Sequence, residues 1–424
     1  MFVCGPAPVL ETISDSDIPV RLFDQVRAVG GLSAGAAVKT DVRRRKLAVP
    51  QLAWEFVSIA LSVMVADGAV RRDRSPDGWT RELSLEIAVT DPGVWNTQVA
   101  ELEQALGFLT TDLWYFSFIA GGETAQMPTK VIRPEVDAVG LLSGGLDSLI
   151  GAIDLTARGV RLLPVSKTVR GDADKQVAFA KQVIRTDDLL QLNDNANTRR
   201  AEKETSQRAR SLIFIAFAVL AASATARYAA GERTPIYLCE NGFIAINPPL
   251  TESRLGSLST RTAHPEFLAR VQRILDALSI NVEIRNPYAL KTKGEMMIEC
   301  RDQDLLERHA AFSTSCGRFQ RYNYVHCGRC VPCQIRRASF LAWGTNDTTD
   351  YVFDDLSRRD ADHAQFDDVM SVAMALAAEP TLGLDRWIGT SLSSPFVSSK
   401  NELRAMVGRG LGELRALHQS LGVW

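Results

Sequence analysis

The residues SGGLDS, which begin at Ser143, have the side chains expected of a loop that holds phosphate. An apolar run precedes them and a segment with helical spacing follows, so the loop would present free backbone N–H groups at the start of a helix. Gly144 and Gly145 let an anion approach the backbone closely. Ser143 and Ser148 add hydroxyl donors, and Asp147 is placed to cap the helix or to hold Mg²⁺. The loop lacks both the lysine of the G-x-x-x-x-G-K-S/T motif and the G-x-G-x-x-G spacing of dinucleotide-binding loops.

A second group with recognisable chemistry is a cluster of thiols with the spacing C-x10-C-x2-C-x2-C. Its members are Cys316, Cys327, Cys330 and Cys333. Two residues between thiols let a turn bring both sulfurs to one ion, and four thiolates leave no open position, which favours structural over hydrolytic zinc. An iron–sulfur cluster is the alternative, although such runs normally continue to a fourth cysteine followed by proline. His326 could replace one thiol, but we interpret it as a bystander.

The elements that must position these groups alternate between strand and helix, in the order that builds a parallel sheet. Strands are predicted at 138–143, 160–166 and 235–240, and helices at 148–158, 173–184, 206–230 and 264–278. The longest apolar run, 212–222, is shorter than the about 20 residues that span a bilayer, so it predicts a buried core helix.

The segments on either side of this core have a different character. Residues 1–130 combine helical spacing at 52–66, a strand that alternates over 81–89, a helix at 98–109 and an aromatic strand at 113–120. They predict a separate N-terminal α+β domain, a candidate partner-binding unit, followed by a linker. We therefore predict an α/β protein in three parts: 1–130, a core at 135–340 with its zinc site at 316–333, and a helical C-terminal extension at 341–424.

The bulk composition is that of an ordinary globular protein, with 46% apolar and 23% charged residues. A formal net charge of -2 supplies no general attraction for nucleic acid, so a nucleic-acid partner is not favoured. The first residues do not form a secretory signal. An odd number of cysteines, seven, with four of them clustered, favours a metal site in a reducing cytoplasm over disulfides. No membrane partner is expected.

The loop resembles the SGGxDS motif, or PP-loop, of ATP pyrophosphatases, which have the adenine nucleotide alpha hydrolase-like (HUP) fold. These enzymes cleave ATP between the α and β phosphates and transfer AMP to an oxygen of the substrate. Together with the late cysteine cluster, residues 135–340 resemble the QueC family, the 7-cyano-7-deazaguanine synthases. Further matching positions are Arg210 in RARSLIFIAFA, Pro265 to Phe267 in HPEF, Pro287, Thr292, Lys293 and Glu295 in NPYALKTKGEM, and Arg336.

The resemblance implies ATP, Mg²⁺ and structural Zn²⁺ as cofactors. It implies that ATP is bound by Ser143, Gly144, Gly145, Leu146, Asp147 and Ser148, and that the catalytic residues are Asp147, Ser148, Lys293 and Arg210. Lys291 is a further candidate cation, with a solvated surface lysine as the alternative. For the substrate we select Glu240, at the end of a predicted strand, because a carboxylate meets the adjacent N–H donors of a guanine-like base. Asn241, Arg261 and His264 are placed in the same pocket, although His264 is equally suited to a helix start.

Several segments depart from an ordinary QueC sequence. The first 135 residues and the helical tail are additions, and 240–250 and 255–267 replace its substrate-side segments. This organisation is most similar to the QueC-like proteins of bacterial antiphage operons, the QatC branch of the Qat system. That similarity implies a role in defence, in which an activated 7-deazaguanine passes to an amine of a partner protein encoded in the same operon rather than to ammonia.

Two other functions stay open. One is a different PP-loop enzyme, such as a tRNA-modifying thiolase or an amidotransferase partner, which would need a basic tRNA face and a catalytic cysteine. The near-neutral charge argues against it. The other is a catalytically inactive nucleotide-binding scaffold, which an intact loop with Asp147 disfavours.

Overall fold

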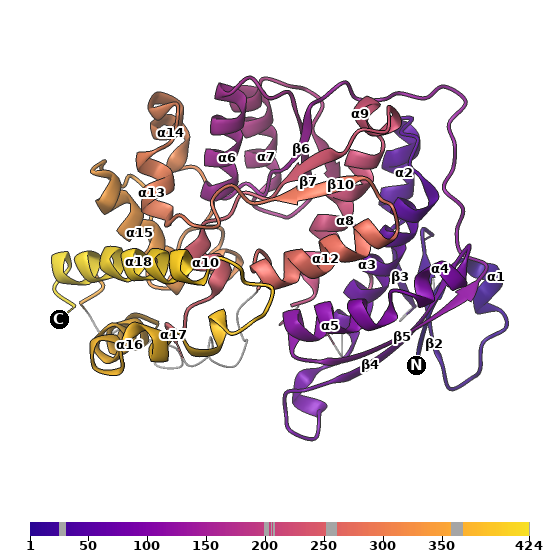
Figure 1. Cartoon of the computed structure of the whole chain (residues 1–424), viewed down its shortest axis with the longest axis horizontal. Helices are drawn as coiled ribbons and strands as arrows, with labels where there is room; N and C mark the ends of the chain where they lie inside the picture. The colour runs from indigo at the N-terminus through magenta and orange to yellow at the C-terminus, as the bar shows by residue number, and fades with distance from the viewer. Residues whose placement is uncertain are drawn as a thin grey trace.

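The structure is a computed structural model that describes residues 1–24, 31–198, 203–204, 206, 208–251, 261–357 and 368–423. Within these ranges the strands form two five-stranded sheets, and every strand pair in both sheets is parallel. In Figure 1 the N-terminal sheet lies to the right and the C-terminal helices to the left, with the second sheet between them. The chain is therefore α/β with two parallel sheets and a helical C-terminal region.

The N-terminal sheet has the strand order β3-β2-β1-β4-β5. Its strands are β1 (Phe2–Gly5), β2 (Ile18–Leu22), β3 (Leu32–Ala34), β4 (Glu82–Val89) and β5 (Leu113–Ala120). Its helices are α1 (Ala7–Leu10), α2 (Ala36–Arg44), α3 (Gln51–Ala69), α4 (Pro92–Asn96) and α5 (Val99–Thr110). The predicted α+β class is wrong for this unit. Helices α4 and α5 connect β4 to β5, and a crossover of this length sets the two strands parallel.

The second sheet repeats this connectivity in the order β10-β9-β6-β7-β8. Its strands are β6 (Ala138–Leu141), β7 (Leu162–Lys167), β8 (Leu190–Leu192), β9 (Thr234–Tyr237) and β10 (Val282–Arg285). The strand order reverses between β6 and β9, and ligands of open α/β sheets bind beyond the carboxyl ends of the strands at such a point. The loop that begins at Ser143 follows β6, and Glu240 follows β9, so the fold places both at the same edge.

The helices between residues 146 and 343 make up most of the rest of this part of the chain. They are α6 (Leu146–Ala157), α7 (Ala173–Phe179), α8 (Arg210–Ser223), α9 (Ala226–Ala229), α10 (Gly242–Ile246), α12 (Pro265–Ala277), α13 (Lys293–Ile298), α14 (Gln303–Ala310) and α15 (Val331–Trp343). The helices predicted at 148–158 and 264–278 are confirmed within two residues. The helix predicted at 206–230 is instead two helices, because the Thr225 side chain accepts a hydrogen bond from Tyr228 N and begins α9. Residues 255–260 of the substituted segment 255–267 lie outside the described ranges.

The two sheets share one continuous hydrophobic core through α3, which packs against α8. Helix α3 is long and apolar enough to cross a membrane by composition, but 94% of its most apolar stretch is buried. Helix α8 contains the longest apolar run and is buried too, as predicted. Both helices are apolar on all sides because each packs against neighbours on all sides.

A buried charge network joins the N-terminal unit to the start of α8. Arg81 forms ion pairs of 2.5 Å with Asp67 and 2.7 Å with Asp112, and Arg72 lies 2.7 Å from Asp112. The second oxygen of Asp67 accepts a hydrogen bond from Ala209 N at 3.0 Å. Removing one member would leave an uncompensated buried charge, so this network fixes how the two units meet.

The C-terminal extension is helical, as predicted, with α16 (Asp368–Leu382), α17 (Leu384–Ile388) and α18 (Lys400–Ser420). Helix α18 packs against α15 and α10. Gly410 permits this contact, because a Cβ atom there would lie 2.4 Å from Phe243 Cδ2 of α10. The division of the chain into independent domains stays a prediction.

Candidate phosphate site and four-cysteine centre

The SGGLDS loop is held by its own serines. Ser148 Oγ accepts a hydrogen bond from Ser143 N at 3.2 Å and donates to Gly145 O at 3.0 Å, while Ser143 Oγ accepts from Gly145 N at 3.1 Å. Gly144 has a φ of 86°, the left-handed region, and a Cβ atom there would lie 3.2 Å from Asp172 Cβ. Helix α6 begins at Leu146, within this motif, and has no side-chain cap. The free N–H groups at a helix start favour an anion.

Asp147 contacts two other predicted site residues, Lys293 and Asn241. Its carboxylate forms a 2.7 Å ion pair with Lys293 Nζ and accepts hydrogen bonds from Asn241 N at 3.2 Å and Asn241 Nδ2 at 2.6 Å. Asp147 therefore does not cap α6, which was one of its two predicted roles. Asn241 caps α10 through Ile244 N, and Thr292 with Glu295 forms a capping box at the start of α13, so both helix ends bring their residues to Asp147.

A cavity of about 260 Å³ opens beside the loop. It is lined by Ser143, Gly145, Leu146, Asp147, Ser148, Cys239, Glu240, Ile244, Lys293, Thr314, Ser315 and Pro332. Glu240 is half-buried, and its carboxylate has no hydrogen-bond or ion-pair partner among the described residues. The pKa of Glu240 is raised from 4.5 to about 7, mainly by burial and to a smaller extent by the charge of Asp147. The cavity thus combines an anion-binding loop, a lysine and an unpaired carboxylate.

Five predicted site residues do not line this cavity. Gly144 and Asn241 contact residues that do, whereas the other three lie elsewhere. Arg210 is the exposed first residue of α8 and stacks over the Phe214 ring. Arg261 and His264 line a separate cavity of about 490 Å³, between α5, α12 and residues 386–394. The prediction of one shared substrate pocket is therefore not met.

The local contacts explain the positions of the predicted residues that lie elsewhere. His264 Nδ1 accepts from Glu266 N at 3.2 Å and caps α12, and its Nε2 is 3.1 Å from Ser391 O, which supports the helix-start interpretation. Burial lowers the pKa of His264 to about 4, so the ring is neutral near pH 7. Arg261 Nη1 donates to Phe108 O at 3.0 Å. Lys291 pairs with Glu299 at 2.5 Å on the surface, as the solvated alternative predicts.

Sequence reasoning missed the segment just before the first clustered cysteine. Thr314 N donates to Gly144 O at 2.9 Å, and Thr314 pairs with Gly145 as an isolated parallel bridge. Lys175 Nζ donates to Thr314 Oγ1 at 2.5 Å. The signal available was proximity in sequence, since Thr314 and Ser315 immediately precede a metal-ligand candidate.

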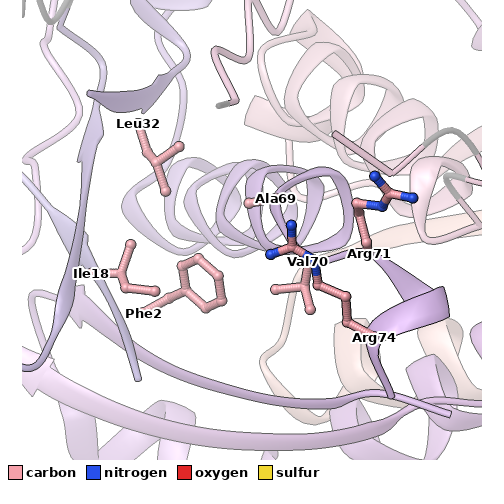
Figure 2. Close-up of a pocket in the computed structure, with 7 residues that line it drawn as sticks. All are labelled: Phe2, Ile18, Leu32, Ala69, Val70, Arg71 and Arg74. Atoms are coloured by element: carbon pink, nitrogen blue, oxygen red, sulfur yellow. The ribbon is translucent and has the colours of Figure 1, made fainter. Parts of the chain in front are cut away.

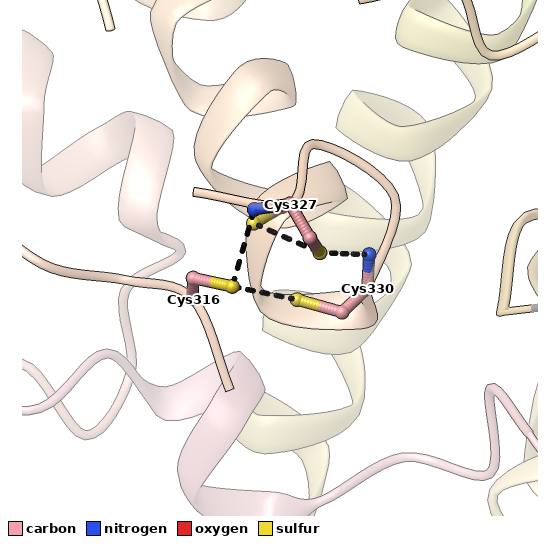
Figure 3. Close-up of side chains that lie close together, drawn as sticks. Cys316, Cys327 and Cys330 are labelled. Carbon is pink, nitrogen blue, oxygen red and sulfur yellow. Dashed lines mark hydrogen bonds between the residues drawn. The ribbon is translucent and has the colours of Figure 1, made fainter. Parts of the chain in front are cut away.

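The four clustered cysteines lie together and are buried, with all four Sγ atoms within 4.8 Å of one another. Figure 3 shows Cys316, Cys327 and Cys330 pointing toward one another. The Cys316–Cys330 and Cys327–Cys333 Sγ atoms are each 3.9 Å apart. A zinc ion about 2.3 Å from each of four sulfurs would set neighbouring sulfurs about 3.8 Å apart. In a four-iron cluster each thiolate binds a different iron, which spreads the sulfurs further.

The cluster could therefore bind a metal such as zinc. His326 is not one of the converging residues. Its Nε2 accepts a hydrogen bond from Ser315 N at 3.1 Å instead, so it supports the segment that leads to Cys316.

A smaller pocket of about 140 Å³ lies in the N-terminal unit, at the end of α3 (Figure 2). It is apolar, with Phe2, Ile18 and Leu32 on one side and Arg71 and Arg74 at the other. It shares no described lining residue with the loop cavity.

No protein-family model matches the chain. A stretch of 90 residues is 28% identical to a 7-cyano-7-deazaguanine synthase of Methanococcus aeolicus. The aligned stretch is 20% of this chain and 38% of that protein, so the chain spans less than half the length of this relative. This weak and partial similarity supports no more than a QueC-like character for the chain.

Proposed function

We propose that the chain is a QueC-like enzyme that uses ATP to adenylate the carboxylate of a 7-deazaguanine and then joins the acyl group to an amine. The observation that carries this proposal is the loop cavity, where the phosphate-type loop, Lys293 and the unpaired Glu240 lie together. The partial similarity to a 7-cyano-7-deazaguanine synthase supports the same substrate class.

The loop supplies the first part of the chemistry. The amides at the start of α6 can take the pyrophosphate end of ATP, and the two serine hydroxyls hold the loop that presents them. A carboxylate oxygen of the substrate attacks the α phosphorus, the bond between Pα and the bridging oxygen breaks, and pyrophosphate leaves. Lys293 faces the same cavity and offsets negative charge on the phosphate or the substrate carboxylate. Asp147 holds Lys293 in place.

Magnesium would neutralise charge on the polyphosphate in such a reaction. The Asp147 carboxylate already carries an ion pair with Lys293 and two bonds from Asn241, so in this arrangement it does not fit the role of a cation ligand. No step proposed here depends on the ion. Zinc in the four-cysteine cluster would be structural, because the four thiolates complete its coordination.

The second step forms the C–N bond. An amine attacks the acyl carbon of the adenylate, AMP leaves, and the amine loses a proton to give an amide. We assign Glu240 to recognition of the substrate, because its free carboxylate can accept two N–H groups of a guanine-like edge. Adenylation converts a poor electrophile into one with a good leaving group, which is why ATP is consumed.

We further propose that the amine belongs to a partner protein and that the chain acts in antiphage defence, as in the QatC branch. The support is the organisation of the chain: α5 of the N-terminal unit, α12 of the core and residues 386–394 of the extension together form the second cavity. Both additions thus contribute to a concave surface that the core alone does not provide.

Mass analysis tests this function. The protein is incubated with ATP, 7-carboxy-7-deazaguanine and either ammonia or the proteins of its operon, and AMP and adducts are measured. The expected result is AMP together with a protein adduct, and Glu240→Gln reduces its formation. A nitrile or free amide with ammonia would retain the enzyme class and remove the partner. No turnover of any deazaguanine would refute the proposal.

The thiolase alternative needs a reactive thiolate in the cavity. Cys239 lines it, but burial raises the pKa of that thiol well above its ordinary value, so it stays protonated and unreactive near neutral pH. Binding of ATP without AMP release under every substrate mixture would instead favour the inactive scaffold.

A further inference from the structure

Arg336 is a fully buried cation without an acidic partner. It lies on α15, three residues after Cys333, and is 0% exposed. Its guanidinium donates only to neutral oxygens: Ala310 O, Ser313 O, Ser313 Oγ, Ser315 Oγ and Thr349 Oγ1. No carboxylate of the described residues pairs with it. Burying a charge without an ionic partner is costly, so a nearby anion would stabilise Arg336 beyond its hydrogen bonds.

The four-cysteine cluster would supply such an anion when it holds a metal. Residues three apart on a helix share a face, so Cys333 and Arg336 are neighbours on α15. Four thiolates around one divalent cation leave a net charge of two minus. A loaded metal site would therefore place negative charge one helical turn from Arg336, which forms no ion pair with a carboxylate of the described residues.

The same guanidinium holds the segment that supports the phosphate-type loop. Its Nη1 donates to Ser313 Oγ at 3.0 Å and to Ser315 Oγ at 3.1 Å. Between these two anchors, Thr314 N donates to Gly144 O, and the next residue after Ser315 is Cys316. One short segment thus touches the metal cluster, Arg336 and the loop.

We propose that Arg336 is a positioning residue that couples the four-cysteine centre to the phosphate-type loop. Metal fixes Cys316 at one end of the segment, Arg336 clamps Ser313 and Ser315, and Thr314 then holds the loop glycines in the conformation that accepts phosphate. The identity of that ligand as ATP rests on the proposed function. The coupling itself does not. Because coupling between two binding sites is reciprocal, bound ATP must also help the protein to retain metal.

Hydrogen exchange without any nucleotide tests the coupling. Peptides that contain Gly145 and Thr314 are followed in zinc-loaded protein, in chelator-stripped protein and in Arg336→Lys, which keeps the charge but loses the planar fork. We expect exchange at Thr314 to accelerate at least tenfold in the stripped protein and in R336K, while peptides from β4 do not change. The matched control is Arg337→Lys, whose parent side chain stacks over Tyr351 and donates to Phe353 O and Asp354 O, outside the segment 313–315.

Unchanged exchange at Thr314 in both stripped protein and R336K would overturn the proposal. If R336K does not fold, Ser315→Ala removes one acceptor of the clamp and is expected to accelerate the same amide several-fold, and no acceleration would likewise refute it. Titration with Mg-ATP then tests the link to function: R336K with full zinc content is expected to bind at least tenfold more weakly than wild type. Absence of ATP binding by wild type would refute the proposed function while leaving the exchange result to decide the coupling.

Discussion

Replacing Lys293 by methionine isolates the role of the ion pair at the centre of the loop cavity. Lys293 and Asp147 are both buried and 2.7 Å apart, so the substitution leaves a buried carboxylate whose only described partners are the Asn241 donors. Breaking a buried pair from one side costs about 3–5 kcal/mol, and we expect the low end because two hydrogen bonds remain. Loss of a charge-assisted contact to phosphate or substrate, worth about 1.5–3 kcal/mol, lowers kcat/KM for AMP formation by about 10- to 150-fold.

Urea unfolding and AMP release measure the two effects separately. Lys291→Met is the matched control, because its pair with Glu299 is exposed and contributes at most about 1 kcal/mol. Adding Asp147→Asn to Lys293→Met removes the stranded charge, so the double variant is expected to be more stable than Lys293→Met alone. Equal stability of Lys293→Met and wild type, or a double variant that is the sum of its parts, would refute the assignment of a buried ion pair.

Three further substitutions test other parts of the account. Gly144→Ala adds a Cβ atom in a left-handed, crowded position, and we expect it to weaken Mg-ATP binding at least tenfold. Gly159→Ala is the control, because Gly159 has a similar φ but no neighbour within 4 Å, and we expect its titration with Mg-ATP to match wild type. Glu240→Gln removes a carboxyl whose folded pKa of about 7 exceeds its ordinary 4.5, so wild type loses stability relative to the variant as pH rises from 4.5 to 7. A constant difference between their urea midpoints across that range would contradict the burial. Gly410→Ala overpacks the contact of α18 with α10 and costs about 1–3 kcal/mol of folding stability. Gly412→Ala, in open space, stabilises the helix by up to about 1 kcal/mol. Equal changes in the melting temperature of the two variants would contradict this packing.

The loop and the cysteine cluster could be predicted because their chemistry is written in consecutive or closely spaced residues. The SGGLDS residues form the turn into α6, and the four thiols converge, as their types and spacing indicate. Lys293 was found through a family motif, and its ion pair with Asp147 adds a reason for the lysine that the motif does not state.

The parts that could not be predicted depend on distant contacts. The alternation in β4 was interpreted as typical of an α+β unit, although the predicted helix between the two strands already pointed to a parallel crossover. Arg261 and His264 belong to the predicted core segment but line a different cavity. They form hydrogen bonds there with Phe108 and Ser391, which lie far away in the chain. The network of Arg81 with Asp67 and Asp112 likewise has no local signature.

Arg336 is a residue whose position, but not whose contacts, could be predicted from the sequence. It lies three residues after Cys333, but its hydrogen bonds are to Ser313 and Ser315, which no motif marks. Spacing predicts which groups share a turn, whereas only the fold reveals which turns touch.

Adenylation of the substrate carboxylate can be tested by identifying the nucleotide product formed from ATP when the zinc-loaded chain is given 7-carboxy-7-deazaguanine and an amine. We expect AMP and pyrophosphate in equal amounts, formed only when the deazaguanine is present. Formation of ADP and phosphate, or AMP at the same rate without the deazaguanine, would contradict it.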